Sequence, residues 1–137
     1  MNILTPRGFL LFGGIILLVL AVAGMTVLGP TPTASALGMF NWLDGGENIA
    51  HLVLGVVAIA AYFLLKDQML AKYLVLLVGV VALLATVFGF LNMGNPDPNT
   101  AGFTNLEVSD DVLHLVVAVW AFAAVLIGGA KSTPASA

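Results

Sequence analysis

The stretch GFLLFGGIILLVLAVAGMTVL (residues 8–28) holds no charged side chain over a length that can cross a lipid bilayer. A transmembrane helix needs about 20 mostly apolar residues. Three further runs, with no charge in their interiors, cover residues 48–65, 71–91 and 112–130. Backbone groups in lipid must be hydrogen-bonded within their own segment, and the runs lack the period-two alternation of barrel strands. We therefore expect four transmembrane helices.

The composition places the whole chain in a membrane. Of its 137 residues, 61% are hydrophobic and 8% are charged, whereas soluble domains carry about 25% charged residues. The length allows one compact unit, and the absence of cysteine excludes disulfides and thiolate sites. We predict an all-α, polytopic protein with a single transmembrane domain over residues 1–137 and the lipid bilayer as its partner.

The connections between the apolar runs differ in length. Residues 29–47 and 92–111 are rich in Pro and Gly and are predicted to be long loops. Residues 66–70 form a tight turn, and residues 131–137 form a tail. Arg7, the first apolar run and TASA (33–36) resemble a secretory signal. The run exceeds the usual h-region of about 7–15 residues, so we expect it to be retained.

Charge predicts the orientation of the helices. The basic residues precede the first run, flank the tight turn and follow the last run, which are places on one side of the membrane. They are Arg7, Lys66, Lys72 and Lys131. The two long loops contain no Lys or Arg and hold six of the seven acidic residues. The positive-inside rule then predicts cytoplasmic termini and outer loops, in a bacterial inner or photosynthetic membrane.

The chain contains an internal repeat. At an offset of 63 residues, the second run aligns with the fourth, pairing Glu47 with Asp110, His51 with His114, Gly55 with Ala118 and Ala58 with Ala121. At an offset of 65, Gly14 meets Gly79 and Gly24 meets Gly89. Each half is predicted to be a helical hairpin. Parallel repeats of this kind are related by an axis along the membrane normal.

The histidine-bearing faces of the second and fourth helices are the candidate sites. Spacings of three and four place residues on one face: Glu47, His51, Gly55 and Ala58 on one helix, and Asp110, His114, Ala118 and Ala121 on the other. The first interpretation is structural. Small residues let membrane helices approach and polar side chains bond across the contact, while acids favour helix N-termini. Asp44 and Glu47 have the spacing of a capping box.

The second interpretation is a tetrapyrrole site. His51 and His114 could ligate haem iron or the magnesium of a chlorophyll. Gly55 and Ala118, one turn deeper, would leave room for a flat macrocycle. In a four-helix bundle, the second and fourth helices can lie diagonally with both histidines facing inward.

The third interpretation is a metal or pH-sensing site. Glu47, His51, Asp110 and His114 offer two imidazoles and two carboxylates, which suit zinc or iron. Alternatively, the same groups could sense external pH, because histidine titrates in that range.

The remaining polar residues indicate no catalysis. The sequence shows no nucleophile–base constellation, phosphate loop or basic nucleic-acid patch, and no charge lies in the interior of a predicted span, which argues against a transporter. We predict a non-enzymatic accessory or scaffolding subunit of a larger respiratory or photosynthetic membrane complex. Trp42 is expected to anchor at the membrane interface, and Trp120 is expected to pack between helices.

Two short motifs carry a resemblance. NIAHLVLG (48–55) and DDVLH (110–114) resemble a family of small bacterial four-helix membrane proteins catalogued as a domain of unknown function. Its pattern is N-x-x-H-x-x-x-G in the second helix and D-x-x-L-H in the fourth. Here Asn48, His51, Gly55, Asp110, Leu113 and His114 match it. The resemblance covers roughly residues 8–130. It implies four helices with cytoplasmic termini and supplies no activity.

Overall fold

Four long helices form the described part of the protein. The computed structural model describes residues 2–95, 99–100, 102 and 104–129. The helices are α1 (Pro6–Thr26), α2 (Gly45–Leu64), α3 (Gln68–Asn92) and α4 (Val108–Gly129), with a short 3₁₀ helix η1 (Gly38–Phe40). All four α-helices are long and apolar enough to cross a membrane. In the described ranges, β-pairing is limited to isolated bridges. The predicted all-α fold with four spans is confirmed.

The helices begin earlier than predicted because polar side chains cap them. Asp44 and Glu47 form the predicted capping box at the start of α2. The Asp67 side chain accepts a hydrogen bond from the Met69 N–H of α3. Such caps satisfy amides that have no partner within the helix. Residues 45–47 and 68–70 are therefore helical, although the sequence predicts a loop and a turn there. Residues 108–111, also predicted as loop, form the first turn of α4. Hydropathy does not detect these polar first turns.

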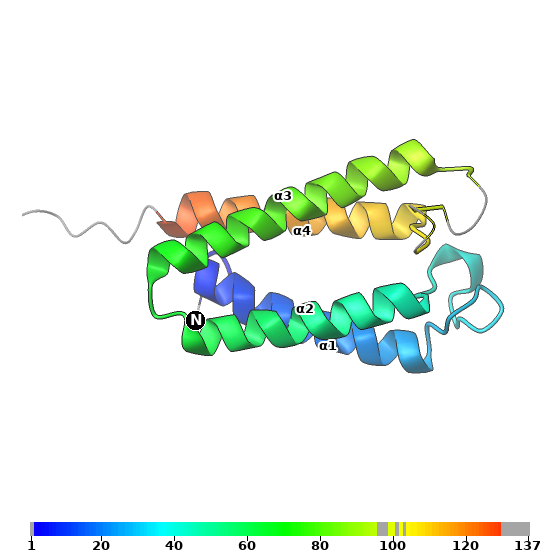
Figure 1. Ribbon diagram of the computed structural model, residues 1–137, viewed down its shortest axis with the longest axis horizontal. Coiled ribbons are helices and arrows are strands. Elements are labelled where there is room, and N and C mark those ends of the chain that lie inside the picture. The colour runs from blue at the N-terminus through cyan, green and yellow to red at the C-terminus, as the bar shows by residue number, and fades with distance from the viewer. Residues whose placement is uncertain (1, 96–98, 101, 103, 130–137) are drawn as a thin grey trace, which may run out of the picture.

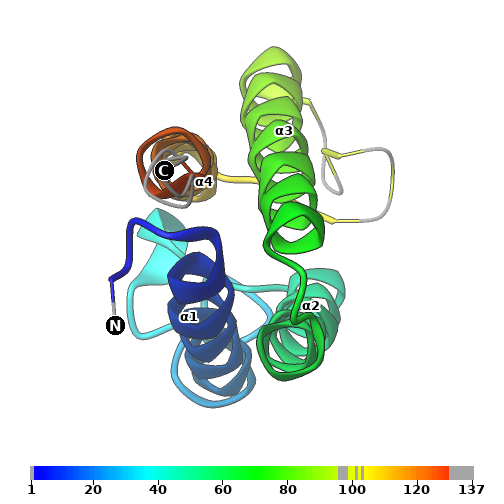
Figure 2. The same cartoon turned by 90° about the vertical axis from the view of Figure 1, so that its left-hand side faces the viewer.

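The helices pair as two antiparallel hairpins (Figure 1). The most extensive packing joins α1 to α2 and α3 to α4, and α1 also contacts both α3 and α4. Viewed along the bundle, α2 and α4 occupy opposite corners (Figure 2). We call the end where α1 begins the base end, and the opposite end, where α2 and α4 begin, the loop end.

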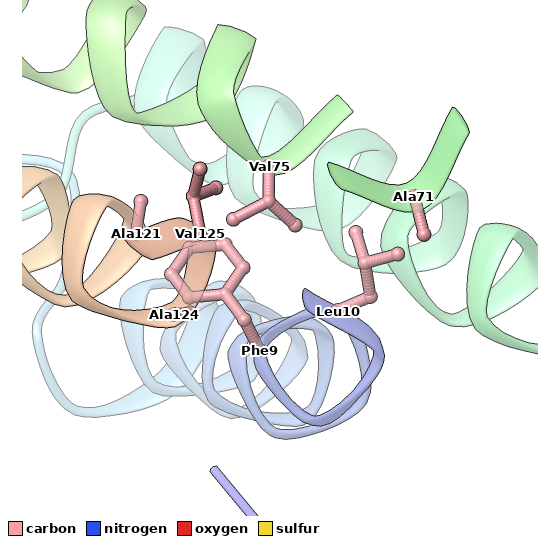
Figure 3. Close-up of a cluster of buried hydrophobic side chains, with 7 residues drawn as sticks. All are labelled: Phe9, Leu10, Ala71, Val75, Ala121, Ala124 and Val125. Atoms are coloured by element: carbon pink, nitrogen blue, oxygen red, sulfur yellow. The ribbon is translucent and has the colours of Figure 1, made fainter. Parts of the chain in front are cut away.

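An apolar core joins the two hairpins near the base end (Figure 3). It comprises Phe9, Leu10, Ala71, Val75, Ala121, Ala124 and Val125. The Trp120 ring packs on Phe9 with centroids 4.5 Å apart, and the Trp120 Nε1–H donates to the Ile3 carbonyl at 2.9 Å. Trp120 is thus a packing residue, as predicted.

Arg7 closes the first hairpin at the base end. Its guanidinium donates to the carbonyl oxygens of Tyr62 at 2.8 Å and Leu65 at 2.7 Å and lies over the Tyr62 ring. These carbonyls belong to the last turn of α2 and its cap, where intrahelical partners run out. Arg7, Lys66 and Lys72 share this end, whereas Lys131 and the predicted tail 131–137 lie outside the described residues.

Candidate functional site

Polar side chains from both long loops meet at the loop end. The Asn41 amide donates to the Asp110 carboxylate and to the Ser109 hydroxyl, both at 3.2 Å. The Ser109 hydroxyl in turn donates to the Phe40 carbonyl at 2.6 Å. Since Asn41 precedes α2 and Asp110 opens α4, these bonds tie the hairpins together.

Asp44 makes a second link between the halves. One carboxylate oxygen accepts from the Thr104 hydroxyl and the Asn105 N–H, each at 2.8 Å. The other accepts from the Glu47 N–H at 2.9 Å, while Glu47 accepts from the Asp44 N–H. The helix cap of α2 is therefore also a contact with the loop before α4. We call Asn41, Asp44, Glu47, Thr104, Asn105, Glu107, Ser109 and Asp110 the loop-end cluster.

Several acids of this cluster are close enough to repel one another. Burial raises the pKa of Glu107 from 4.5 to about 9, and hydrogen bonding and charge repulsion from Asp110 and the charge of Glu47 add to the effect. One Glu107 carboxyl oxygen is buried without a hydrogen-bond partner among the described residues. At neutral pH, Glu107 therefore holds its proton, which reduces the negative charge of the cluster.

The two histidines lie beside this cluster. Each is partly buried, and each has a buried Nδ1 with no hydrogen-bond partner in the described structure. His51 interacts electrostatically with both His114 and Asp110, and Glu47 interacts with Asp110. The fold thus brings the four residues of the predicted metal set into one region, although they come from helices at opposite corners of the bundle.

Proximity does not make these residues a metal site. Within the described ranges, no group of three or more His, Asp or Glu side chains is arranged to hold a metal ion. We therefore assign no metal to Glu47, His51, Asp110 and His114. Of the four, Asp110 accepts a hydrogen bond across the hairpins from Asn41, and Glu47 belongs to the capping box of α2.

The space expected for a macrocycle is partly filled. Gly55 faces α1, and a Cβ at this position would lie 2.9 Å from the Leu18 side chain and 3.1 Å from the Gly14 carbonyl oxygen. Ala118 is buried. The glycine that was expected to leave room for a tetrapyrrole thus serves helix packing.

Two apolar hollows lie elsewhere on the helices. One, of about 480 Å³, is lined by Leu4, Leu115, Val116, Val119, Trp120 and Ala123. The other, of about 320 Å³, is lined by Ile15, Leu18, Val19 and Val22. Neither is lined by His51 or His114.

The structure reveals a pair of contacts that sequence reasoning missed. In the first hairpin, the Asn48 side-chain oxygen packs directly on Gly24 of α1; in the second, the Asp111 carboxylate packs directly on Gly89 of α3. We call these contacts the first and second glycine notches. The 63-residue offset also aligns Asn48 with Asp111, so extending the alignment by one position would have found the pair.

The first outer loop differs from its prediction in one respect. Trp42 was expected at the membrane interface, but it is 8% exposed, and the prediction is wrong. The loop instead exposes Met39 and Phe40, at 83% and 73%. The loop folds back so that Trp42 and Leu43 pack inward, and the apolar side chains of η1 face outward.

Comparison with known families identifies the fold family. The protein-family model described as "Domain of unknown function (DUF4383)" matches residues 7–127. The chain belongs to this family. The family resemblance predicted from the two histidine motifs is thereby confirmed, at the level of a domain of unknown function. Neither the curated proteins nor the solved structures gave a match. Family membership supplies no activity, so function must be argued from the molecule.

Proposed function

We propose that this protein is a non-enzymatic accessory or scaffolding subunit of a larger membrane complex, respiratory or photosynthetic. The observation that carries the proposal is an apolar patch on the first outer loop. It consists of Leu37, Met39 and Phe40, which are 52%, 83% and 73% exposed. We call it the η1 patch. Its loop, cyan in Figure 1, extends beyond the end of α1.

The η1 patch is held in place by the rest of the loop end. The Phe40 carbonyl accepts from the Ser109 hydroxyl, and the Asn41 carbonyl accepts from the Ser35 hydroxyl at 2.6 Å. The neighbouring amide of Asn41 is bonded across to α4. A preorganised surface loses little conformational freedom on binding, and clustered exposed apolar side chains mark interaction sites. We assign this patch to a neighbouring membrane-protein subunit.

The charge distribution supports an orientation for this surface. Arg7, Lys66 and Lys72 lie at the base end, and the acids of the loop-end cluster lie at the other end. By the positive-inside rule, we place the base end on the cytoplasmic side of a bacterial inner or photosynthetic membrane. The η1 patch then faces the outer side, where the partner subunit would contact it.

Site-specific photocrosslinking tests this proposal. A photoreactive residue at Phe40, expressed in native membranes, is expected to give a discrete protein adduct. The matched control is Leu84, which is 58% exposed in the middle of α3 and is expected to label lipid. Without the photoreactive residue, the substitution Phe40→Ser should abolish co-purification of the partner at unchanged protein level. Lipid adducts alone at position 40, with a solitary purified protein, would contradict the proposal.

A histidine-ligated haem or chlorophyll is the second candidate. The observation favouring it is that His51 and His114, from opposite corners of the bundle, are near enough to interact electrostatically. An absorption spectrum of the purified protein tests it, because a Soret or Qy band lost in His51→Ala or His114→Ala would identify the ligands. Metal analysis of the same sample tests zinc or iron at these residues. A colourless, metal-free protein would reject both.

A further inference from the structure

The two hairpins pack by the same contacts at two levels. Near mid-helix, a Cβ on Gly14 would lie 3.2 Å from Ala58 Cβ, and a Cβ on Gly79 would lie 3.1 Å from Ala121 Cβ. Towards the loop end, the glycine notches repeat the pattern with Asn48 and Asp111. All four pairings keep the offsets of 65 and 63 residues that relate the halves.

The second notch places an acid where the first has an amide. The Asn48 amide is neutral, and its Nδ2 donates to the Leu43 carbonyl at 3.1 Å, leaving Oδ1 against Gly24. Asp111 is 0% exposed, and both its carboxyl oxygens are buried with no hydrogen-bond partner among the described residues. An ionised carboxylate in such a place would be both desolvated and unpaired, which is strongly unfavourable.

Among the described residues, no lysine or arginine lies beside Asp111. On α3, its neighbours are Gly89 and Thr86, whose hydroxyl donates to the Asp111 backbone carbonyl at 3.2 Å. On its own helix, Asp110 precedes it and its charge acts on Asp111. In the loop before α4, the Glu107 carbonyl accepts from the Asp111 N–H. Arg7, Lys66 and Lys72 lie at the base end.

We propose that Asp111 is a proton-binding site: its neutral carboxyl fills the second notch as the Asn48 amide fills the first, and it releases its proton to solvent when α3 and α4 separate. Proton uptake then favours closure of the second hairpin, whereas the first hairpin closes at any pH. The inference is independent of the partner subunit. It rests on the burial of Asp111 and on the matched geometry of the notches.

A reciprocal exchange tests the proposal. Asp111→Asn should keep the fold at pH 6. In the native protein, α3 and α4 should separate at alkaline pH. This separation, measured as the distance between spin labels on the two helices, should be smaller in Asp111→Asn. Asn48→Asp should add the same pH dependence to the α1–α2 hairpin, which lacks it in the native protein. Asp67→Asn, an exposed cap at the base end, is the matched control and should change neither hairpin.

Infrared spectroscopy provides a readout that does not depend on variant stability. At neutral pH, the folded native protein should show the carbonyl band of a protonated carboxyl that is lost in Asp111→Asn. The substitution Glu107→Gln identifies the separate band of Glu107. Retention of the whole protonated-carboxyl signal in Asp111→Asn, or unchanged alkaline opening of α3–α4 in that variant, would overturn the proposal. Unfolding of Asp111→Asn at pH 6 would also overturn it, because a neutral isostere should fit.

Discussion

The base end and the loop end of this bundle are held together by different chemistry. At the base end, the hairpins meet through apolar side chains such as Leu10 and Val75. At the loop end, they meet through hydrogen bonds from Asn41 and Asp44. Lipid is as apolar as leucine, so helix association in a membrane depends on close packing and interhelical hydrogen bonds. The base end uses the first of these, together with the hydrogen bond from Trp120 to the Ile3 carbonyl, and the loop end uses the second.

This comparison predicts that the largest loss of stability comes from the base end. Leu10 of α1 is 1% exposed and belongs to the core that it shares with Ala71 and Val75 of α3. Leu10→Ala should lower the free energy of unfolding by about 2 kcal/mol, because a buried side chain is removed and the cavity is only partly refilled. Unfolding in mixed micelles measures the change. The control Val19→Ala, at a 62% exposed position, should have little effect. An equal loss of stability there would mean that burial in the core does not determine the cost.

A smaller loss is expected from the loop end. Asn41→Ala removes two hydrogen bonds and leaves the buried Asp110 carboxylate with fewer partners. The expected total cost is about 1 kcal/mol, at the low end for two hydrogen bonds, because both are long at 3.2 Å. Hydrogen exchange at the start of α4 should increase while the base end stays protected. If the base end also lost protection, the two ends would not be independent units of packing.

The smallest effect should come from titrating the loop end. The pKa of Glu107 is raised from 4.5 to about 9, so the folded protein retains a proton that the unfolded chain releases. The stabilisation is complete below pH 4.5 and is lost as pH rises through about 9. Glu107 is partly exposed, so solvent screening reduces the effect.

The substitution Glu107→Gln checks this titration. It should flatten the dependence of the unfolding midpoint on pH between 6 and 9 while leaving Leu10→Ala equally destabilising. A pH profile identical to that of the native protein would show that Glu107 does not contribute. Asp111→Asn is expected to change the α3–α4 distance, whereas Glu107→Gln is expected to change the pH dependence of the unfolding midpoint. The two variants therefore distinguish titration in the loop-end cluster from titration in the second notch.

Much of the fold and some of the candidate site followed from sequence patterns. The capping box at Asp44 and Glu47 was predictable because it is local, involving residues three positions apart. The polar starts of α2 and α4 were misplaced because hydropathy does not register helical turns rich in Asp, Glu and Gly. The grouping of His51, His114 and Asp110 was not predictable, since it depends on how α2 and α4 are placed across the bundle.

By itself, the sequence determined the four spans and the segregation of the described Lys and Arg residues to one end, because hydropathy and charge act through the solvent that surrounds each segment. The tertiary structure alone decided that Trp42 is buried and Phe40 exposed. It also decided that the Asp111 carboxyl has no hydrogen-bond partner among the described residues, while the Asp110 carboxylate accepts from Asn41. Those outcomes depend on contacts between residues far apart along the chain. No local pattern specifies such contacts.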